Sequence, residues 1–234
     1  MVDAAGRLRR LELAQHDGDL LDALPPSEVV AVDAPLAVPN DDGQRDLERV
    51  LAWCDAPPFP ASRQRLRRLH GRLRGVDLAP SLAATGDLVE AAPDLVLRQL
   101  AWERRRAEDA EPLELGAYRE EWLGVRAPAY RPKGRARARP AGLSPAADLL
   151  GGVLDLGGWG PGGRADDAGA LHDAARLDAL ACAYVAHLLA TRPERALVLG
   201  TTERGRIAFP ADANLRERVR INLERLREDG QVAI

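Results

Sequence analysis

A continuous apolar run near the start of the chain, Val29 to Val32, places the strongest constraint on its fold. Consecutive apolar residues rich in valine are typical of a strand that is buried on both faces of a parallel sheet. Asp33 follows the run directly, and Pro35 cannot donate a hydrogen bond to a neighbouring strand. The pattern therefore predicts a buried parallel strand with the Asp33 carboxylate at its carboxyl end.

Other segments predict further strands and helices, in an order that is typical of an α/β protein. The expected strands cover 7–13, the segment around Leu88 and Val89, 195–200 and 205–210. The expected helices cover 19–24, 41–54, 62–75, the stretch after Pro93, 143–156 and 170–190. A last amphipathic helix is expected at about 212–228, and residues 107–130 predict an excursion on the surface. A length of 234 residues favours one domain over two.

The composition indicates which environment suits the chain. No run of about 18 apolar residues is present, and the first 25 residues carry acids and arginines where a signal peptide carries an apolar stretch. The two cysteines, Cys54 and Cys182, lie far apart and give neither a disulfide framework nor zinc-binding spacing. We therefore expect a cytoplasmic protein with reduced thiols and without a membrane segment.

Basic residues are clustered in two short segments, although the net charge of the chain is −3. The first segment contains Arg63, Arg65, Arg67, Arg68, Arg72 and Arg74, and the second contains Arg131, Lys133, Arg135, Arg137 and Arg139. Clustered guanidinium groups create a field that attracts phosphates, so both segments are candidate nucleic-acid contacts. The chief candidates are Arg63, Arg67, Arg131, Arg135, Arg137 and Arg139. The alternative interpretation is a solvated helix face and a basic loop.

Lys133 is the single lysine among 33 basic residues. A flexible ammonium group can follow a phosphate or a metal-bound intermediate where a planar guanidinium does not fit. Lys133 is therefore a candidate catalytic residue, and chance retention of one lysine is the alternative.

Asp178 is an acid in an unusual setting. In a helix, its neighbours three and four positions away are Ala174, Ala175, Ala181 and Cys182, so its carboxylate projects from a small, apolar face. A buried charge needs protonation, an ion partner or a metal. A salt bridge to an arginine would explain Asp178 alone, and a turn would explain Asp33 alone. Together, the two acids predict a site for Mg²⁺ or Mn²⁺, which prefer carboxylate oxygens.

Four blocks of sequence carry a resemblance to a known family. In order, they are VVAVDAPLAVP, DLVEAAPDLVLRQLA, YRPKGRARARPAGL and RLDALACAYVAHLL. Together they resemble the predicted RNase H-like nucleases catalogued as domain of unknown function number 429, over nearly the whole chain. The resemblance implies a single RNase H-like α/β domain, residues 1–234, with a mixed sheet flanked by helices. It also implies metal-assisted hydrolysis of phosphodiester bonds with Mg²⁺ or Mn²⁺.

The resemblance assigns roles to individual residues. The family's Asp-x-Pro strand ending matches Asp33, its strand-borne glutamate matches Glu90, its Lys-Gly element matches Lys133 and its Asp-Ala-Leu helix matches Asp178. It implies that Asp33 and Asp178 hold the metal, with Glu90 as a third catalytic acid. Asp173 is a further candidate metal ligand. It also implies that Lys133 and the arginines of 131–139 hold the phosphate.

The start of the chain departs from the family pattern. Family members begin with a strand that bears Gly-x-Asp, whereas MVDAAGRLRRLELA resembles the second strand. We therefore expect an incomplete metal site with little or no nuclease activity, and either pairing of 7–13 with 29–33 or an open groove there. Two other functions stay open. One is a nucleic-acid-binding pseudoenzyme, and the other is an actin-like-branch phosphotransferase that would use the glycine-rich loop 157–163.

Overall fold

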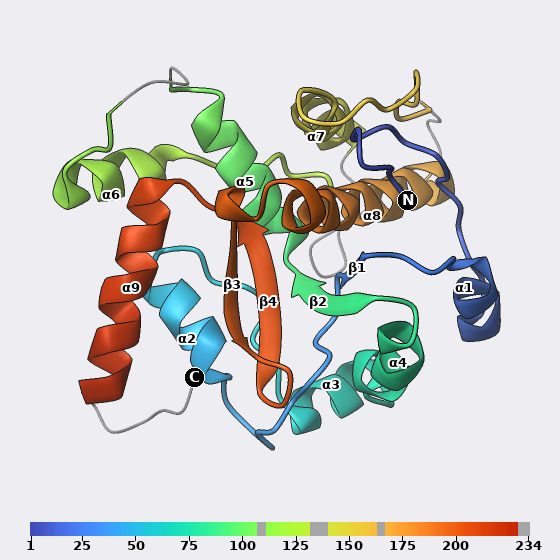
Figure 1. Ribbon diagram of the computed structural model, residues 1–234, viewed down its shortest axis with the longest axis horizontal. Helices are drawn as coiled ribbons and strands as arrows, with labels where there is room; N and C mark the ends of the chain where they lie inside the picture. Colours follow the sequence, from blue (N-terminus) through green and yellow to red (C-terminus); the bar gives the residue numbers. More distant parts are fainter. Residues whose placement is uncertain (107–110, 132–139, 163–166, 229–234) are drawn as a thin grey trace.

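A four-stranded mixed sheet forms the centre of the computed structural model, which describes residues 1–106, 111–131, 140–162 and 167–228 (Figure 1). The strands are β1 (Val29–Val32), β2 (Asp87–Ala91), β3 (Ala196–Thr201) and β4 (Gly205–Pro210), in the order β1-β2-β4-β3. β1, β2 and β4 are parallel, and β3 is antiparallel to β4. The α/β class and the mixed sheet are therefore as predicted.

The register between β1 and β2 decides which side chains share a face of the sheet. Ala31 is paired with Val89, and Val32 is paired with Glu90. Since side chains alternate along a strand, Val32 and Glu90 point to the face opposite Ala31 and Val89. Asp33, one residue beyond Val32, returns to the face of Ala31.

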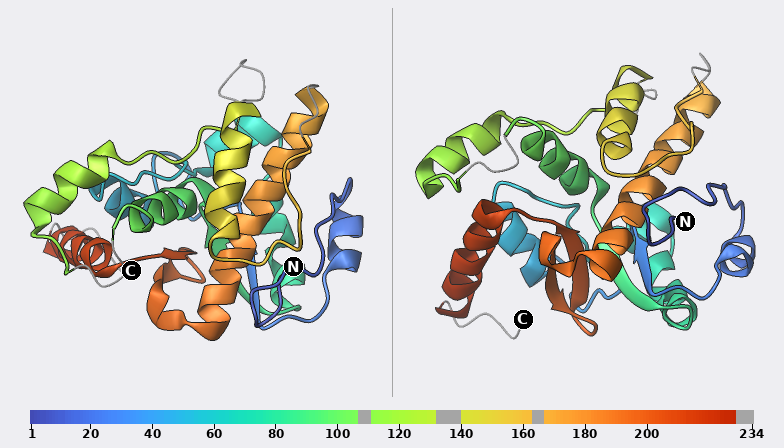
Figure 2. Two further views of the ribbon diagram at one scale, coloured as in Figure 1. Left: turned by 90° about the horizontal axis from the view of Figure 1, so that it is seen from above. Right: turned by 45° about the horizontal axis from the view of Figure 1, so that its top comes forward.

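Helices cover both faces of the sheet (Figure 2). Their bounds are α1 Asp17–Ala23, α2 Asp46–Trp53, α3 Arg63–His70, α4 Arg74–Ala83, α5 Pro93–Glu103, α6 Leu115–Gly124, α7 Leu143–Gly151, α8 Asp167–Thr191 and α9 Ala213–Glu228, with short 3₁₀ turns at Pro140–Gly142 and Pro193–Arg195. The long helix α8 runs across β1, and α7 packs beside α8. On the other face, α2 and α9 lie side by side (Figure 1).

Two apolar clusters form the core, one on each face. The first joins α7 and α8 to β2, β3 and β4, and it includes Val89 and Leu177, both fully buried. The second joins α2, α6 and α9 to β3 and β4, and it includes Phe209, also fully buried. Helix α5 contributes to both clusters, with Val96 in the first and Trp102 in the second.

The predicted surface excursion at 107–130 is wrong for its central part. Helix α6 buries Tyr118 and Trp122 completely, and the ring of Tyr118 lies 5.1 Å from that of Trp102 in an edge-to-face contact. Two aromatic residues four positions apart lie on one helix side, so they can enter the same core together. Because the composition of residues 107–130 is irregular, the sequence does not predict α6.

The N-terminal strand predicted at 7–13 does not form. Arg7 makes one isolated bridge to Asp155, in the segment that follows α7, and Leu8 makes another to Val2. β1 is consequently an edge strand, with β2 as its sole partner within the described ranges. Only Val30 of its four residues is buried, so the prediction of a strand buried on both faces is wrong, although its parallel pairing is as predicted. Of the two alternatives expected here, the pairing of 7–13 with 29–33 therefore does not occur.

The helix predicted at 62–75 is divided. Gly71 ends α3 with a φ of +72°, a conformation that glycine adopts without strain, and α4 follows. The sequence does not predict α4.

The C-terminal amphipathic helix is observed. Of its apolar residues, Leu215, Val219 and Leu226 are buried, and Leu223 is partly buried. No helix within the described part of the chain is long and apolar enough to cross a membrane.

Candidate carboxylate site

Asp33 and Asp178 meet at the carboxyl end of β1. Nη2 of Arg131 lies 2.7 Å from Oδ2 of Asp33 and 2.5 Å from Oδ1 of Asp178. Because both carboxylate oxygens contact this one nitrogen atom, they lie at most about 5.2 Å apart. The structure brings together two acids that are far apart in the sequence, as predicted.

The local sequence explains why this juxtaposition is possible. Asp33 projects toward α8 because it follows β1 on the Ala31 face. The side of α8 near Asp178 is made of small residues, including Ala174 and Ala181, which are both buried. Small residues let a helix approach a sheet closely, so the short aspartate side chains reach a common point.

Tyr130 holds the Asp178 carboxylate in place. Its hydroxyl donates to Oδ1 of Asp178 at 2.5 Å, and Nε of Arg131 donates to the same oxygen at 2.8 Å. Burial raises the pKa of the Tyr130 phenol well above its usual value, so Tyr130 is a protonated donor. The sequence interpretation missed this residue, although Tyr130 directly precedes the basic segment.

The electrostatics of the site favour a cation. Burial raises the pKa of Asp33 to about 6, the Arg131 guanidinium opposes this rise, and the carboxylates of Asp178 and Asp94 add to it. Burial also raises the pKa of Asp178, against the opposing effect of Arg131. Converging carboxylates repel each other, and a positive group between them relieves the repulsion. Arg131 is that positive group in this structure.

The site is open to solvent. The Asp33 side chain is 40% exposed, that of Asp178 is 21% exposed and that of Arg131 is 31% exposed. Solutes can therefore reach the carboxylate oxygens without unfolding of the core. Cys182, one helical turn beyond Asp178, is buried beneath them, and burial raises the pKa of its thiol.

Glu90 does not join this site. It is buried on the opposite face of the sheet, where Nη1 and Nη2 of Arg45 donate to its two carboxylate oxygens at 2.7 Å each. The backbone N–H of Leu36 also donates to it. The interpretation of Glu90 as a third catalytic acid is therefore wrong, because the register places it one residue out of phase with Asp33.

Asp173 is occupied elsewhere. It accepts a hydrogen bond from the backbone N–H of Gly162 at 2.8 Å and one from Arg176 at 3.1 Å. Five positions before Asp178, it lies on a different side of α8. Asp173 thus fixes the glycine-rich segment to α8 and is not a ligand of the Asp33 site.

The remaining predicted residues divide into two groups. Lys133, Arg135, Arg137 and Arg139 lie outside the described residues. Arg63 and Arg67 lie on α3. Arg63 donates to the Val38 carbonyl at 2.9 Å and faces Asp41 at 3.6 Å, whereas Arg67 is exposed.

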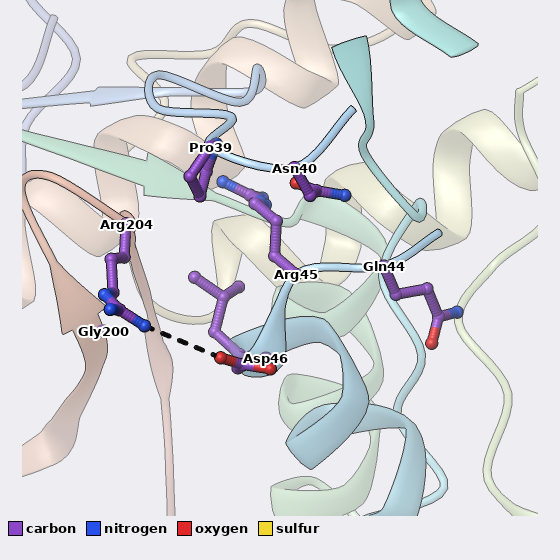
Figure 3. Close-up of a pocket in the computed structure, with 8 residues that line it drawn as sticks. Pro39, Asn40, Gln44, Arg45, Asp46, Gly200 and Arg204 are labelled. Carbon is purple, nitrogen blue, oxygen red and sulfur yellow. Dashed lines mark ion pairs between the residues drawn. The ribbon is translucent and has the colours of Figure 1, made fainter. Parts of the chain in front are cut away.

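A separate hollow lies at the start of α2 (Figure 3). It is lined by Pro39, Asn40, Gln44, Arg45, Asp46, Leu47, Gly200 and Arg204. Figure 3 shows Arg204 directed toward Asp46, and the ion pair between them is 3.9 Å long. The charged groups of this hollow already have partners within the protein, so it adds no candidate residues to the carboxylate site.

The donor set at Asp33 fits one hard divalent ion. Mg²⁺ is commonly held by one or two carboxylates, with waters and substrate phosphate oxygens as the other ligands. Asp33 and Asp178 supply two such carboxylates at a suitable separation. Within the described residues, no group of three or more histidine, cysteine, aspartate or glutamate side chains could hold a metal. A metal at this site would therefore depend on those two acids.

Comparison of the chain with protein-family models, with curated proteins and with solved structures gives no match. The fold and activity implied by the resemblance to RNase H-like nucleases therefore stay predictions. The geometry of the Asp33 site is the observation that bears on function.

Proposed function

We propose that the chain is a metal-dependent phosphodiester hydrolase of the RNase H-like type, acting at Asp33 and Asp178, with low activity because the described residues bring only two acids together at this site. One observation carries this proposal. The end of β1 and helix α8 direct the carboxylates of Asp33 and Asp178 to one solvent-accessible point. These two acids are 145 positions apart in the sequence. Such an arrangement costs free energy through charge repulsion, which suits a site that binds cations. Two buried free thiols are in keeping with the proposed cytoplasmic location.

Each residue of the site has a defined task in this proposal. Asp33 and Asp178 hold the Mg²⁺ or Mn²⁺ ion, which when bound would activate water and stabilise the developing negative charge. Tyr130 fixes the orientation of the Asp178 carboxylate through its hydroxyl group. Arg131 leaves the position between the two acids, and its guanidinium group then becomes available to a substrate phosphate.

A second function, nucleic-acid binding without cleavage, is favoured by Arg131 itself. Its guanidinium group already neutralises both carboxylates, so the site is electrostatically satisfied without a metal. In that case the two acids would position Arg131 for a phosphate contact. Cleavage assays distinguish the two functions.

The test is cleavage of end-labelled single-stranded and duplex DNA and RNA in Mg²⁺, in Mn²⁺ and in EDTA. The hydrolase proposal requires metal-dependent cleavage that is lost in Asp178→Asn and retained in Asp173→Asn, which carries the same change on the same helix. Oligonucleotide binding without cleavage in either metal would support the second function. Cleavage that persists in Asp178→Asn would exclude this site.

A further inference from the structure

We propose that one side of α3, together with Phe59, binds single-stranded nucleic acid. This α3 patch consists of Phe59, Arg65 and Arg68, with Gln64 beside them. The inference rests on the proposed substrate class, but it does not depend on metal binding at Asp33. Within the first basic segment, it assigns ligand binding to Arg65 and Arg68 in place of Arg63 and Arg67.

Three of the six arginines of the 63–74 segment are engaged within the protein. Arg72 and Arg74 form ion pairs with Asp17 at 2.6 and 2.7 Å. Arg63 donates to a backbone carbonyl and faces Asp41. These three guanidinium groups have structural partners, so they are poor candidates for phosphate contacts.

Arg65 and Arg68 are different. Arg65 makes a long contact of 3.4 Å with the Pro60 carbonyl and has no carboxylate partner in the described ranges. Arg68 is exposed and has none there either. Three positions apart on α3, they lie on the same side of the helix and both line a shallow hollow. Two unneutralised guanidinium groups at one hollow favour an anionic ligand.

Phe59 gives the patch an aromatic surface. Its side chain is 51% exposed and lies between Pro58 and Pro60, whose fixed φ angles restrict the loop. The Arg65 guanidinium lies 5.2 Å from the centre of the ring. An exposed ring beside unpaired arginines is the combination with which proteins stack bases while contacting the backbone of a single strand.

The hollow also offers groups that can contact base edges. Gln44 and Gln64 line it together with Pro60, Ser62, Arg65 and Arg68. Asp42 lines it as well and limits the positive field. A partner that combines phosphates with flat, hydrogen-bonding bases matches this mixture better than a phosphate ion alone.

Helix α9 shows that abundant arginine does not by itself make a binding surface. Arg220 of α9 is exposed like Arg68, but it donates to Glu217 at 2.6 Å and to Glu224 at 2.6 Å. Arg218 donates to Asp55 at 2.7 Å. Arg220 is therefore a matched control, because removing it deletes an exposed positive charge that is already neutralised.

The α3 patch and the Asp33 site are connected through the segment that follows β1. Gly75, at the start of α4, lies so close to this segment that an added Cβ would come within 2.4 Å of the Pro35 carbonyl. Leu66 of α3 packs with Val38. A single strand on the α3 patch would therefore lie beside the segment that leads directly from Asp33.

The test measures fluorescence anisotropy of labelled dT15, rU15 and a 15-base-pair duplex, in EDTA. EDTA removes the metal, and the unsubstituted protein keeps Arg131 paired with Asp33 and Asp178, so the Asp33 site does not contribute. We expect Phe59→Ala to weaken single-strand binding at least fivefold without changing its salt dependence. We expect Arg65→Ala with Arg68→Ala to lower the slope of log K against log salt by about 1 to 1.5. Arg220→Ala should change neither quantity.

Several results would overturn the α3 patch. They are no binding of either single strand, equal binding of single strands and duplex, or a Phe59→Ala effect no larger than that of Arg220→Ala. Circular dichroism of each variant excludes loss of folding as the cause. Failure of the hydrolase proposal is seen separately, as absent cleavage by the unsubstituted chain, and leaves the binding result unaffected.

Discussion

Two arginine-centred triplets lie on opposite faces of the same sheet, and they differ chiefly in burial. In the Arg45 triplet, Arg45 joins Glu48 to Glu90, and the three side chains are 4%, 0% and 3% exposed. In the Arg131 triplet, Arg131 joins Asp33 to Asp178, and all three side chains are accessible. The same charge pattern is therefore structural where it is sealed, and it is available for function where solvent reaches it.

Burial of the Arg45 triplet is balanced by its hydrogen bonds. Arg45 also donates to the Ala37 carbonyl at 2.9 Å, and Glu48 accepts from the backbone N–H of Ala61 at 3.0 Å. Burial lowers the pKa of Arg45, but the bonds to Glu90 and Glu48 outweigh it and leave that pKa raised. Burial raises the pKa of Glu48, against the effect of Arg45. Removing one member would leave buried groups without partners.

The largest expected effect comes from making the same substitution in both triplets. Arg45→Met should lower the free energy of unfolding by about 3–5 kcal/mol, because it leaves two buried carboxylates without a positively charged partner. Arg131→Met should change it by less than about 1 kcal/mol, because water can solvate Asp33 and Asp178. Urea denaturation of both variants measures the difference. Equal losses would mean that burial does not separate the triplets, and Arg45→Lys provides a milder variant if Arg45→Met does not fold.

A second prediction disturbs the Arg45 triplet without removing charge. Gly205 has a φ of +99°, and an added Cβ would lie 2.4 Å from Nη1 of Arg45 and 3.2 Å from Oε1 of Glu90. Gly205→Ala should therefore cost roughly 1–3 kcal/mol of stability. Gly158→Ala is the matched control, since Gly158 has a φ of +81° and nothing lies within 4 Å of an added Cβ. A cost no greater than that of the control would show that the triplet tolerates displacement.

A third prediction concerns the accessible triplet and its cation. If Arg131 occupies the position of a metal, Arg131→Met should raise the affinity for Mn²⁺ on the order of tenfold, because the competing charge is gone. Electron paramagnetic resonance of free Mn²⁺ measures the affinity directly. Asp33→Asn in the same background should abolish binding. Unchanged affinity in Arg131→Met would separate the arginine from the metal site.

The smallest expected effect is a pH dependence of stability from Asp33, measured in EDTA. Its folded-state pKa of about 6 lies above the unfolded value, so the folded state holds the proton more tightly. This contribution is fully present below about pH 4 and is lost as the pH rises through about 6. The melting temperature of the unsubstituted protein relative to Asp33→Asn should therefore fall over that interval.

Arg131 sharpens the same measurement. Because Arg131 opposes the rise in the Asp33 pKa, Arg131→Met should move the pH interval upward. A difference in melting temperature that is constant with pH, or an interval that moves downward, would contradict the electrostatic description of the accessible triplet.

Local sequence patterns were sufficient to predict the elements that build the site. A valine run followed by Asp33 and Pro35 predicted β1 and its acid, and the small residues around Asp178 predicted a helix with an acid on its small, apolar side. These features depend on periodicity and on backbone preferences, which act over a few residues. These features can therefore be predicted from short segments of the sequence.

The choice of partner for each charged side chain depends on how distant segments pack together. Glu90 follows the same local logic as Asp33, but a register that pairs it with Val32 sends it to the opposite face and to Arg45. Arg131 had the pattern of a surface phosphate contact, and it lies between two acids. Both outcomes depend on pairing between distant segments, where a shift of one residue reverses the face of a side chain. Short-range sequence patterns do not contain that information.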